Sequence, residues 1–169
     1  MRIVVLADTH LREDRPRRLP DTVWAAIAEC QLVLHAGDVV DRTLFDALDT
    51  TKVPYHAVLG NNDHALQGSI PERVEIDLER VRIAMVHESG ASKGRPARLR
   101  KWFPDARIVV FGHSHVPCNE WHDGRLLFNP GSPTERRRQP LHSYGVLELD
   151  AGRVIRHEIV RFKTEVIPG

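Results

Sequence analysis

Five short polar motifs constrain this chain most, because each one follows a run of residues with the pattern of a β-strand. They combine glycine with aspartate, asparagine and histidine, and they are Asp8-Thr9-His10, Gly37-Asp38, Gly60-Asn61-Asn62-Asp63, His87 and Gly112-His113-Ser114-His115. Open sheets bind ligands at the carboxyl ends of their strands. Carboxylate, amide and imidazole groups form the ligand set of mixed oxygen and nitrogen metal centres. The sequence therefore predicts a metal centre and a metal-dependent hydrolase.

The first half of the chain has the element order of a parallel α/β structure. Residues 3–7, 32–34 and 55–59 are apolar runs that predict buried strands. Between them, Asp21 is expected to cap a helix whose apolar face includes Val23, Trp24, Ile27 and Ala28. A second helix is marked by Leu44, Phe45 and Leu48. This alternation implies parallel strands with right-handed crossovers.

The second half of the chain has a different pattern. Residues 74–78 and 81–85 alternate apolar with polar side chains, as half-buried antiparallel strands do. A helix over 97–103 and a buried strand over 108–111 follow, and Asp123-Gly124 and Ala151-Gly152 predict two hairpin turns. Together the elements predict a four-layer α/β/β/α sandwich, in which two mixed β-sheets pack face to face with helices outside. The length of 169 residues predicts a single domain over 1–169.

Composition narrows the functional classes. The net charge of +1 gives no global attraction to nucleic acid, which stays open as a partner but is not indicated. Cys30 and Cys118 are too few for a disulfide framework and fit buried or half-buried thiols in a reducing compartment. An apolar stretch of about 20 residues, as needed to span a bilayer, is absent from the sequence, as is a signal peptide. We therefore expect a cytoplasmic protein without a membrane partner.

Residue spacing relates the first and last motifs to metal binding. Asp8 and His10 are two residues apart, and residues two apart in an extended segment point the same way, so both can reach one ion. The same spacing lets His113 and His115 serve one ion each. Each pair alone is weak, since aspartate also suits turns and single histidines are common on surfaces. Five such motifs at strand ends favour the metal centre.

The middle motifs supply the remaining candidates. Gly37 permits a sharp turn, after which Asp38 could bridge two cations through its two oxygens or simply cap a helix. Asn61 offers a side-chain oxygen to a metal, and Asp63 would orient a neighbouring donor or a water, although both are also typical of a turn. His87 ends a predicted strand, where a solvent-facing histidine is the alternative.

The motif order DxH, GDxxD, GNxD, His and GHxH resembles that of the calcineurin-like metallophosphoesterases, and most closely their small bacterial and archaeal phosphodiesterase branch. The segment Asn129-Pro130-Gly131-Ser132-Pro133 is similar to the NPGS segment of that branch. The resemblance runs from Met1 to about Arg161, nearly the whole chain. It implies the same α/β/β/α sandwich that the strand pattern predicts.

The resemblance also implies a dinuclear metal centre. The ligands of the first ion would be Asp8, His10, Asp38 and His115. The ligands of the second ion would be Asp38, Asn61, His87 and His113, so that Asp38 bridges the two. In this family a water or hydroxide between the ions is the nucleophile, activated by two cations about 3.5–4 Å apart. A protein nucleophile is not needed, and no serine or cysteine lies in a recognisable triad.

Two positions depart from the family pattern. Many members have a histidine that assists the leaving group where this chain has Asn62, although members of the small branch often lack it too. Asn62 could instead donate a hydrogen bond to a phosphate oxygen. The usual His-Gly-His is here His87-Glu88-Ser89, which keeps the ligand histidine. We assign catalytic roles to Asn62, Asp63 and His87.

These features predict a phosphodiesterase that acts on a phosphate-ester small molecule or a nucleotide. Two alternatives stay open. One is a phosphomonoesterase at the same site, and the other is a non-catalytic interaction scaffold, the main role of some proteins with this fold, such as the small retromer subunit. Two divalent metal ions are expected, and Mn²⁺ is the preferred identity. Mixed Asp, Asn and His ligands also accept Fe, Zn²⁺, Ni²⁺ or Co²⁺. A homo-oligomer is compatible with the sequence.

Overall fold

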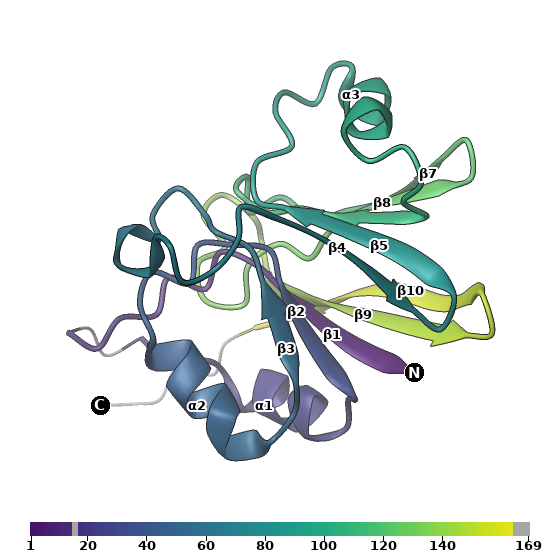
Figure 1. The fold of residues 1–169 in the computed structure, drawn as a ribbon. Coiled ribbons are helices and arrows are strands. Elements are labelled where there is room, and N and C mark those ends of the chain that lie inside the picture. The colour runs from purple at the N-terminus through teal and green to yellow at the C-terminus, as the bar shows by residue number, and fades with distance from the viewer. Residues whose placement is uncertain (15–16, 164–169) are drawn as a thin grey trace.

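The fold is a sandwich of two five-stranded β-sheets (Figure 1). A computed structural model describes residues 1–14 and 17–163. The strands of the first sheet are β1 (Arg2–Leu6), β2 (Leu32–His35), β3 (Tyr55–Ala57), β9 (His142–Asp150) and β10 (Arg153–Phe162). Those of the second are β4 (Arg73–Leu78), β5 (Val81–Val86), β6 (Ile108–Val110), β7 (Cys118–His122) and β8 (Arg125–Asn129). The predicted domain extends to residue 169, and residues 164–169 lie outside the described part.

Both sheets are mixed. The first has the order β10-β9-β1-β2-β3, and its strands β1, β2 and β3 are parallel. The second has the order β4-β5-β6-β8-β7, with β5, β6 and β8 parallel and the two edge strands antiparallel to their neighbours. Because the parallel strands of one sheet share a direction, their carboxyl ends meet at one edge.

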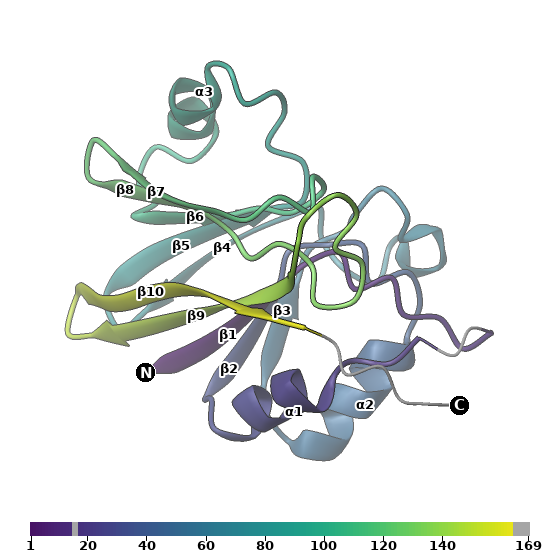
Figure 2. The same ribbon diagram turned by 180° about the vertical axis from the view of Figure 1, so that it is seen from behind.

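Helices cover the outer faces of the sandwich. α1 (Asp21–Ala28) and α2 (Thr43–Thr51) lie together on the first sheet, whereas α3 (Arg95–Trp102) lies on the side of the second sheet, as Figure 2 shows from behind. A short 3₁₀ helix, η1 (His64–Leu66), follows β3. The α/β/β/α sandwich predicted from the sequence is confirmed. No helix in residues 1–14 and 17–163 combines the length and the apolar character that crossing a bilayer requires.

Strand β1 explains why the first apolar run is continuous rather than alternating. Val4 and Leu6 pack in the core beneath α1 and α2, and Ile3 and Val5 pack in the core between the sheets. A strand covered on both faces needs apolar side chains at every position. The same rule corrects the prediction for β5, which is buried at every position except Arg82 rather than on one face only, because α3 covers its second face.

Local predictions hold at the turns and fail at one helix start. Asp123 and Gly124 have φ angles of 45° and 76°, the left-handed pair that a tight two-residue hairpin needs. Asp21 does not cap α1: Pro20 occupies the N-cap position with an extended backbone, and Asp21 is the first helical residue. The third strand ends at Ala57, two residues earlier than predicted.

The two sheets approach each other closely at Gly145 of β9. A Cβ atom at this position would overlap the ring of Phe128 on β8 and lie 3.1 Å from Val5 Cβ. We therefore expect Gly145→Ala to lower the free energy of unfolding by about 1–3 kcal/mol through overpacking. Urea denaturation measures this. Ile155→Ala at an exposed position of β10 is the control and should change stability by less than about 0.5 kcal/mol. Equal stability of Gly145→Ala and wild type would contradict the packing.

Candidate metal centre

The polar motifs from both sheets converge on one end of the sandwich. Asp8 follows β1 and Asp38 follows β2, while His87 follows β5 and His115 follows β6. All four side chains are buried, none being more than 3% exposed. Because their strands run in parallel within each sheet, the chain returns to the same edge each time. The fold therefore gathers residues that are up to 107 positions apart in the chain.

One group of ligand atoms surrounds His10. Its Nε2 atom lies 3.4 Å from Nε2 of His115 and 3.6 Å from Oδ2 of Asp38. Nε2 of His115 lies 3.4 Å from Oδ1 of Asp8. These are the residues assigned to the first ion, and the structure brings all of them together.

A second group surrounds Asn61. Its Oδ1 atom lies 3.0 Å from Nε2 of His87 and 2.9 Å from Nδ1 of His113. Nε2 of His87 lies 3.5 Å from Oδ1 of Asp38. These are the residues assigned to the second ion. Asp38 is common to both groups, with Oδ2 nearest the first and Oδ1 nearest the second.

The donor set fits divalent cations. Bonds of about 2.1 Å from a metal to nitrogen or oxygen place neighbouring ligand atoms about 3.0–3.4 Å apart, close to the spacings in both groups. Oδ2 of Asp8 is buried and has no hydrogen-bond partner among residues 1–14 and 17–163. Burying a carboxylate oxygen without a partner costs free energy unless a cation contacts it. Asp8, His10 and His115 form one cluster that could hold an ion, and Asp8, Asp38 and His87 form another.

Backbone carbonyls orient two of the histidines. Nδ1 of His87 donates to the carbonyl of Ala36 at 2.7 Å, and Nδ1 of His115 donates to the carbonyl of Glu135. With the proton held on Nδ1, the lone pair of Nε2 faces the centre in each ring. This carbonyl support is the usual way in which proteins fix the tautomer of a metal-binding histidine.

The candidate ligands sit on strained backbone. Left-handed φ angles occur at Asp8 (54°), His10 (46°), Asp38 (60°), His113 (68°) and His115 (57°). Non-glycine residues rarely adopt this conformation, and each instance costs on the order of 1–3 kcal/mol. The prediction that Asp8-His10 and His113-His115 lie in extended segments is therefore wrong, because β1 ends at Leu6 and β6 at Val110. Tight loops, not strand alternation, direct these side chains.

Two glycines allow the loops to pack against each other. A Cβ atom on Gly37, whose φ is 88°, would lie 2.6 Å from Nδ1 of His87. A Cβ atom on Gly60 would overlap the backbone nitrogen and carboxylate of Asp38. The sharp turn expected at Gly37 is confirmed by its positive φ, and both positions require glycine because a side chain would clash.

Asp63 holds the loops that carry the other residues. Its Oδ2 accepts hydrogen bonds from the amides of Asp38 (3.0 Å) and Gly60 (2.6 Å), and its Oδ1 accepts one from Val40 (2.6 Å). Asn62, which is exposed, donates from Nδ2 to Oδ2 of Asp38 at 2.7 Å and from its amide to Oδ1 at 2.8 Å. Asp63 therefore positions backbone, and Asn62 directly contacts the shared carboxylate.

The segment after β8 braces the centre from the other side. Oγ of Ser132 donates to the carbonyl of Asp8 at 2.8 Å, and Nδ2 of Asn129 donates to the carbonyl of Gly112 at 2.9 Å. His35 is fully buried behind the site, with Nε2 3.1 Å from Oγ1 of Thr9. His35 is therefore a packed residue of β2 that supports the loop after β1.

Burial sets the charge states at the centre. Desolvation raises the pKa of Asp8 to about 7, and it lowers the pKa of His115 to about 4. Burial also opposes protonation of His87. The hydrogen bond and the ion pair between His87 and Asp38 outweigh this effect, so the pKa of His87 is raised. The same interactions hold the pKa of Asp38 well below its usual range, against the effect of burial. Asp38 is thus the permanently charged member of the cluster.

A match to a known family adds to this geometry. The family model described as the calcineurin-like phosphoesterase superfamily domain matches residues 1–152. The chain belongs to the calcineurin-like phosphoesterase superfamily. A probable metallophosphoesterase of Methanothermobacter thermautotrophicus is 32% identical over 164 residues, which cover 95% of this chain and 92% of that protein.

Solved structures share the fold of this phosphoesterase domain. Vps29 of Entamoeba histolytica, crystallised in complex with Zn²⁺, is 24% identical with a TM-score of 0.75, covering 95% of this chain and 99% of its own. A novel archaeal phosphodiesterase is 19% identical with a TM-score of 0.69, covering 95% of this chain and 100% of its own. At these identities the likeness shows the architecture alone.

Sequence reasoning missed several groups that act on the centre of this phosphoesterase domain. The carbonyls of Ala36 and Glu135 orient histidines, and backbone acceptors leave no signal in a sequence. The Glu135 carboxylate lies 2.9 Å from Nη1 of Arg17 and 4.0 Å from Nε2 of His10, across a long sequence separation.

The two residues that follow His87 differ in exposure. Glu88 is exposed, whereas Ser89 is buried and its carbonyl accepts a hydrogen bond from Nε of Arg98.

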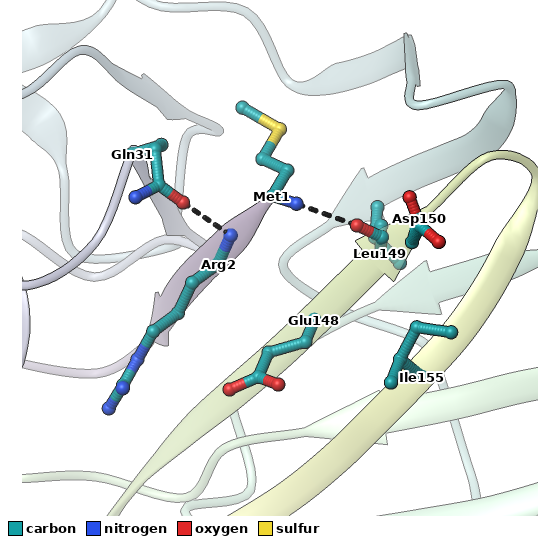
Figure 3. Close-up of a pocket in the computed structure, with 7 residues that line it drawn as sticks. All are labelled: Met1, Arg2, Gln31, Glu148, Leu149, Asp150 and Ile155. Carbon is teal, nitrogen blue, oxygen red and sulfur yellow. Dashed lines mark hydrogen bonds between the residues drawn. The ribbon is translucent and has the colours of Figure 1, made fainter.

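A different hollow lies at the opposite end of β1. Figure 3 shows it between the chain start and the β9–β10 hairpin, where the Met1 amino group donates to the carbonyl of Leu149 at 2.6 Å. Arg2, Gln31 and Glu148 also line it. This lining contains none of the seven candidate metal ligands, which lie at the other end of the strand.

Asp63→Asn tests the loop-holding role. The amide presents an NH₂ group to backbone donors, so we expect unfolding stability to fall by about 1–3 kcal/mol. Metal affinity should fall about tenfold because the ligand loops lose their support. Thermal unfolding and calorimetric metal titration measure the two effects. Asp46→Asn on the exposed face of α2 is the matched control. A variant that kept wild-type stability and affinity would contradict this role.

Metal affinity should depend on pH. Below a pH of about 7 the buried Asp8 retains a proton that a cation must displace, and protonated His87 competes in the same way. Calorimetric Mn²⁺ titrations should therefore show affinity rising from about pH 5.5 to about pH 7.5, with proton release on binding. Asp8→Asn should give weaker binding with a shallower pH dependence. Affinity independent of pH in wild type would contradict the protonation states.

Proposed function

We propose that the protein is a phosphodiesterase that works with two divalent cations. The observation that carries this proposal is the position of Asp38, whose two oxygens face two separate groups of ligand atoms. Membership of a family of metal-dependent phosphoric ester hydrolases supports it. The fold likeness to an archaeal phosphodiesterase agrees with it.

The residues would divide between the two cations as their distances suggest. Asp8, His10 and His115 would hold the first, Asn61, His87 and His113 would hold the second, and Asp38 would contact both. When bound, two such cations supply Lewis acidity that activates water and polarises a phosphoryl oxygen. We propose Mn²⁺ as the metal, because Asp, Asn and His ligands suit it, although Fe, Zn²⁺, Ni²⁺ and Co²⁺ suit the same set.

Asp38 and Asn62 would act as a pair. Asp38 stays ionised because its pKa is held low, so it can keep its place between two cations at neutral pH. Asn62 donates to Asp38 from an exposed position, which leaves its Nδ2 within reach of a bound ester. We propose that Nδ2 turns to a phosphoryl oxygen when substrate binds. A neutral amide donates a hydrogen bond but no proton, so it suits diesters with stable leaving groups better than it suits general acid catalysis.

The fold likeness to Vps29 favours a second candidate, an interaction scaffold. The strained backbone at five of the candidate ligands argues for metal binding, because backbone strain of this kind persists where function requires it. The free thiols of Cys30 and Cys118 support our proposal of a cytoplasmic location. The substrate class that we propose is a phosphate-ester small molecule or nucleotide.

Hydrolysis of an activated diester tests the proposed function. Purified protein with Mn²⁺ should hydrolyse bis(p-nitrophenyl) phosphate faster than p-nitrophenyl phosphate, and a chelator should abolish both reactions. Asp38→Ala and His87→Ala should each lower kcat by roughly two orders of magnitude or more, because each removes a metal contact. Absorbance at the nitrophenolate band follows the rate.

Matched substitutions control for charge and side-chain type. Asp105→Ala and His122→Ala change an exposed or half-exposed residue outside the centre and should keep wild-type rates. Circular dichroism verifies that all four variants fold. Full activity in folded Asp38→Ala would contradict the mechanism. A wild-type protein that binds Mn²⁺ poorly and turns over neither substrate would favour the scaffold.

A further inference from the structure

Three consecutive arginines follow the segment that braces the centre, and the middle one is held in a closed turn. The amide of Gln139 donates to the carbonyl of Arg136 at 2.8 Å, and Nη1 of Arg136 donates back to the carbonyl of Gln139 at 2.6 Å. Arg137 itself has a left-handed φ of 48°. The turn therefore presents Arg137 from a defined backbone position, unlike the loose basic loop that a run of arginines usually indicates.

The Arg137 side chain reaches back to the metal centre. Its Nη1 donates to the carbonyl of His113 at 3.4 Å. The guanidinium therefore lies beside the loop that carries His113 and His115, while Arg137 itself remains exposed.

Arg137 differs from Arg12 and Arg17, two arginines in the loop after β1, in its ion-pair partners. Arg12 pairs with Asp14 at 3.1 Å, and Arg17 pairs with Glu135 at 2.9 Å. Within residues 1–14 and 17–163, Arg137 forms no ion pair with a carboxylate. A permanent positive charge beside a site for divalent cations is repelled by them, and an anion placed between these charges removes the repulsion.

A hollow beside the loops that follow Asp38 and Asp63 is predominantly acidic. Its lining includes the carboxylates of Glu13, Asp41 and Asp46, and the guanidinium of Arg42 there pairs with Asp46 at 3.3 Å. These carboxylates disfavour a phosphate group. Charge therefore directs the anionic part of a substrate toward Arg137.

We propose that Arg137 binds a non-bridging oxygen of the substrate's phosphoryl group and so forms an anion subsite beside the metal centre. The planar guanidinium fork matches the geometry of two phosphate oxygens. The subsite selects phosphate esters over neutral esters and aligns the phosphorus for attack. This inference rests on the proposed phosphodiesterase function, and it assigns Arg137 a substrate-binding role distinct from metal binding.

Comparison of Arg137→Met with Arg138→Met tests the subsite. Both variants remove one exposed arginine charge from the same turn. Calorimetric titration of the Mn²⁺-loaded proteins with inorganic phosphate should show a dissociation constant about tenfold higher in Arg137→Met, the effect of losing a charge-assisted hydrogen bond. KM for bis(p-nitrophenyl) phosphate should rise by a similar factor. Arg138→Met should match wild type, and Arg137→Lys should recover part of the phosphate affinity.

The outcomes separate this inference from the proposed function. The shift in melting temperature on adding Mn²⁺ should be the same in all these proteins, because Arg137 is not a ligand. An active wild type with equal phosphate affinity in Arg137→Met and Arg138→Met would overturn the subsite and leave the phosphodiesterase intact. Phosphate binding that depends on Arg137 in a protein without turnover would support the subsite and overturn the proposed function. Failure of the metal-loaded wild type to bind phosphate would overturn the subsite.

Discussion

The burial of two carboxylates at one end of a sandwich governs the rest of this structure. Asp8 and Asp38 follow neighbouring parallel strands and are 0% and 1% exposed. Burying like charges together is costly unless cations or donors balance them. The raised pKa of Asp8, at about 7, reflects this cost, and the hydrogen bonds to Asp38 from Asn62 relieve part of it. The surrounding histidines and the proposed cations complete the balance.

A rigid scaffold is what allows such a cluster to exist. The left-handed backbone at Asp8, Asp38 and His115 costs free energy, which well-packed sheets on either side can offset. Gly37 and Gly60 let the loops from neighbouring strands touch, and Asp63 joins them through three amide hydrogen bonds. The strain therefore lies in the loops, and the cores on both faces of the sheets hold it in place.

The sequence predicts the architecture well because buried strands require apolar residues, and that pattern is visible in the sequence. Continuous apolar runs predict the parallel strands β1 and β2 of the first sheet, and Asp123-Gly124 predicts the β7–β8 hairpin of the second. The expectation that residues two apart point the same way failed at Asp8 and His10. Strand β1 ends before them, and both residues have left-handed φ angles. The carbonyls of Ala36 and Glu135 were also beyond prediction, since backbone acceptors carry no residue-type signal. The identity of the seven candidate ligands as metal ligands stays a prediction.

Metal stoichiometry and spin coupling test the central claim most directly. The account predicts that purified protein binds two Mn²⁺ ions per chain, with an electron paramagnetic resonance spectrum of an exchange-coupled pair, because one carboxylate is proposed to contact both ions. Asp38→Asn should lose the coupling even where one ion remains bound. A wild-type protein that binds a single ion, or two ions with uncoupled spectra, would contradict a centre shared through Asp38.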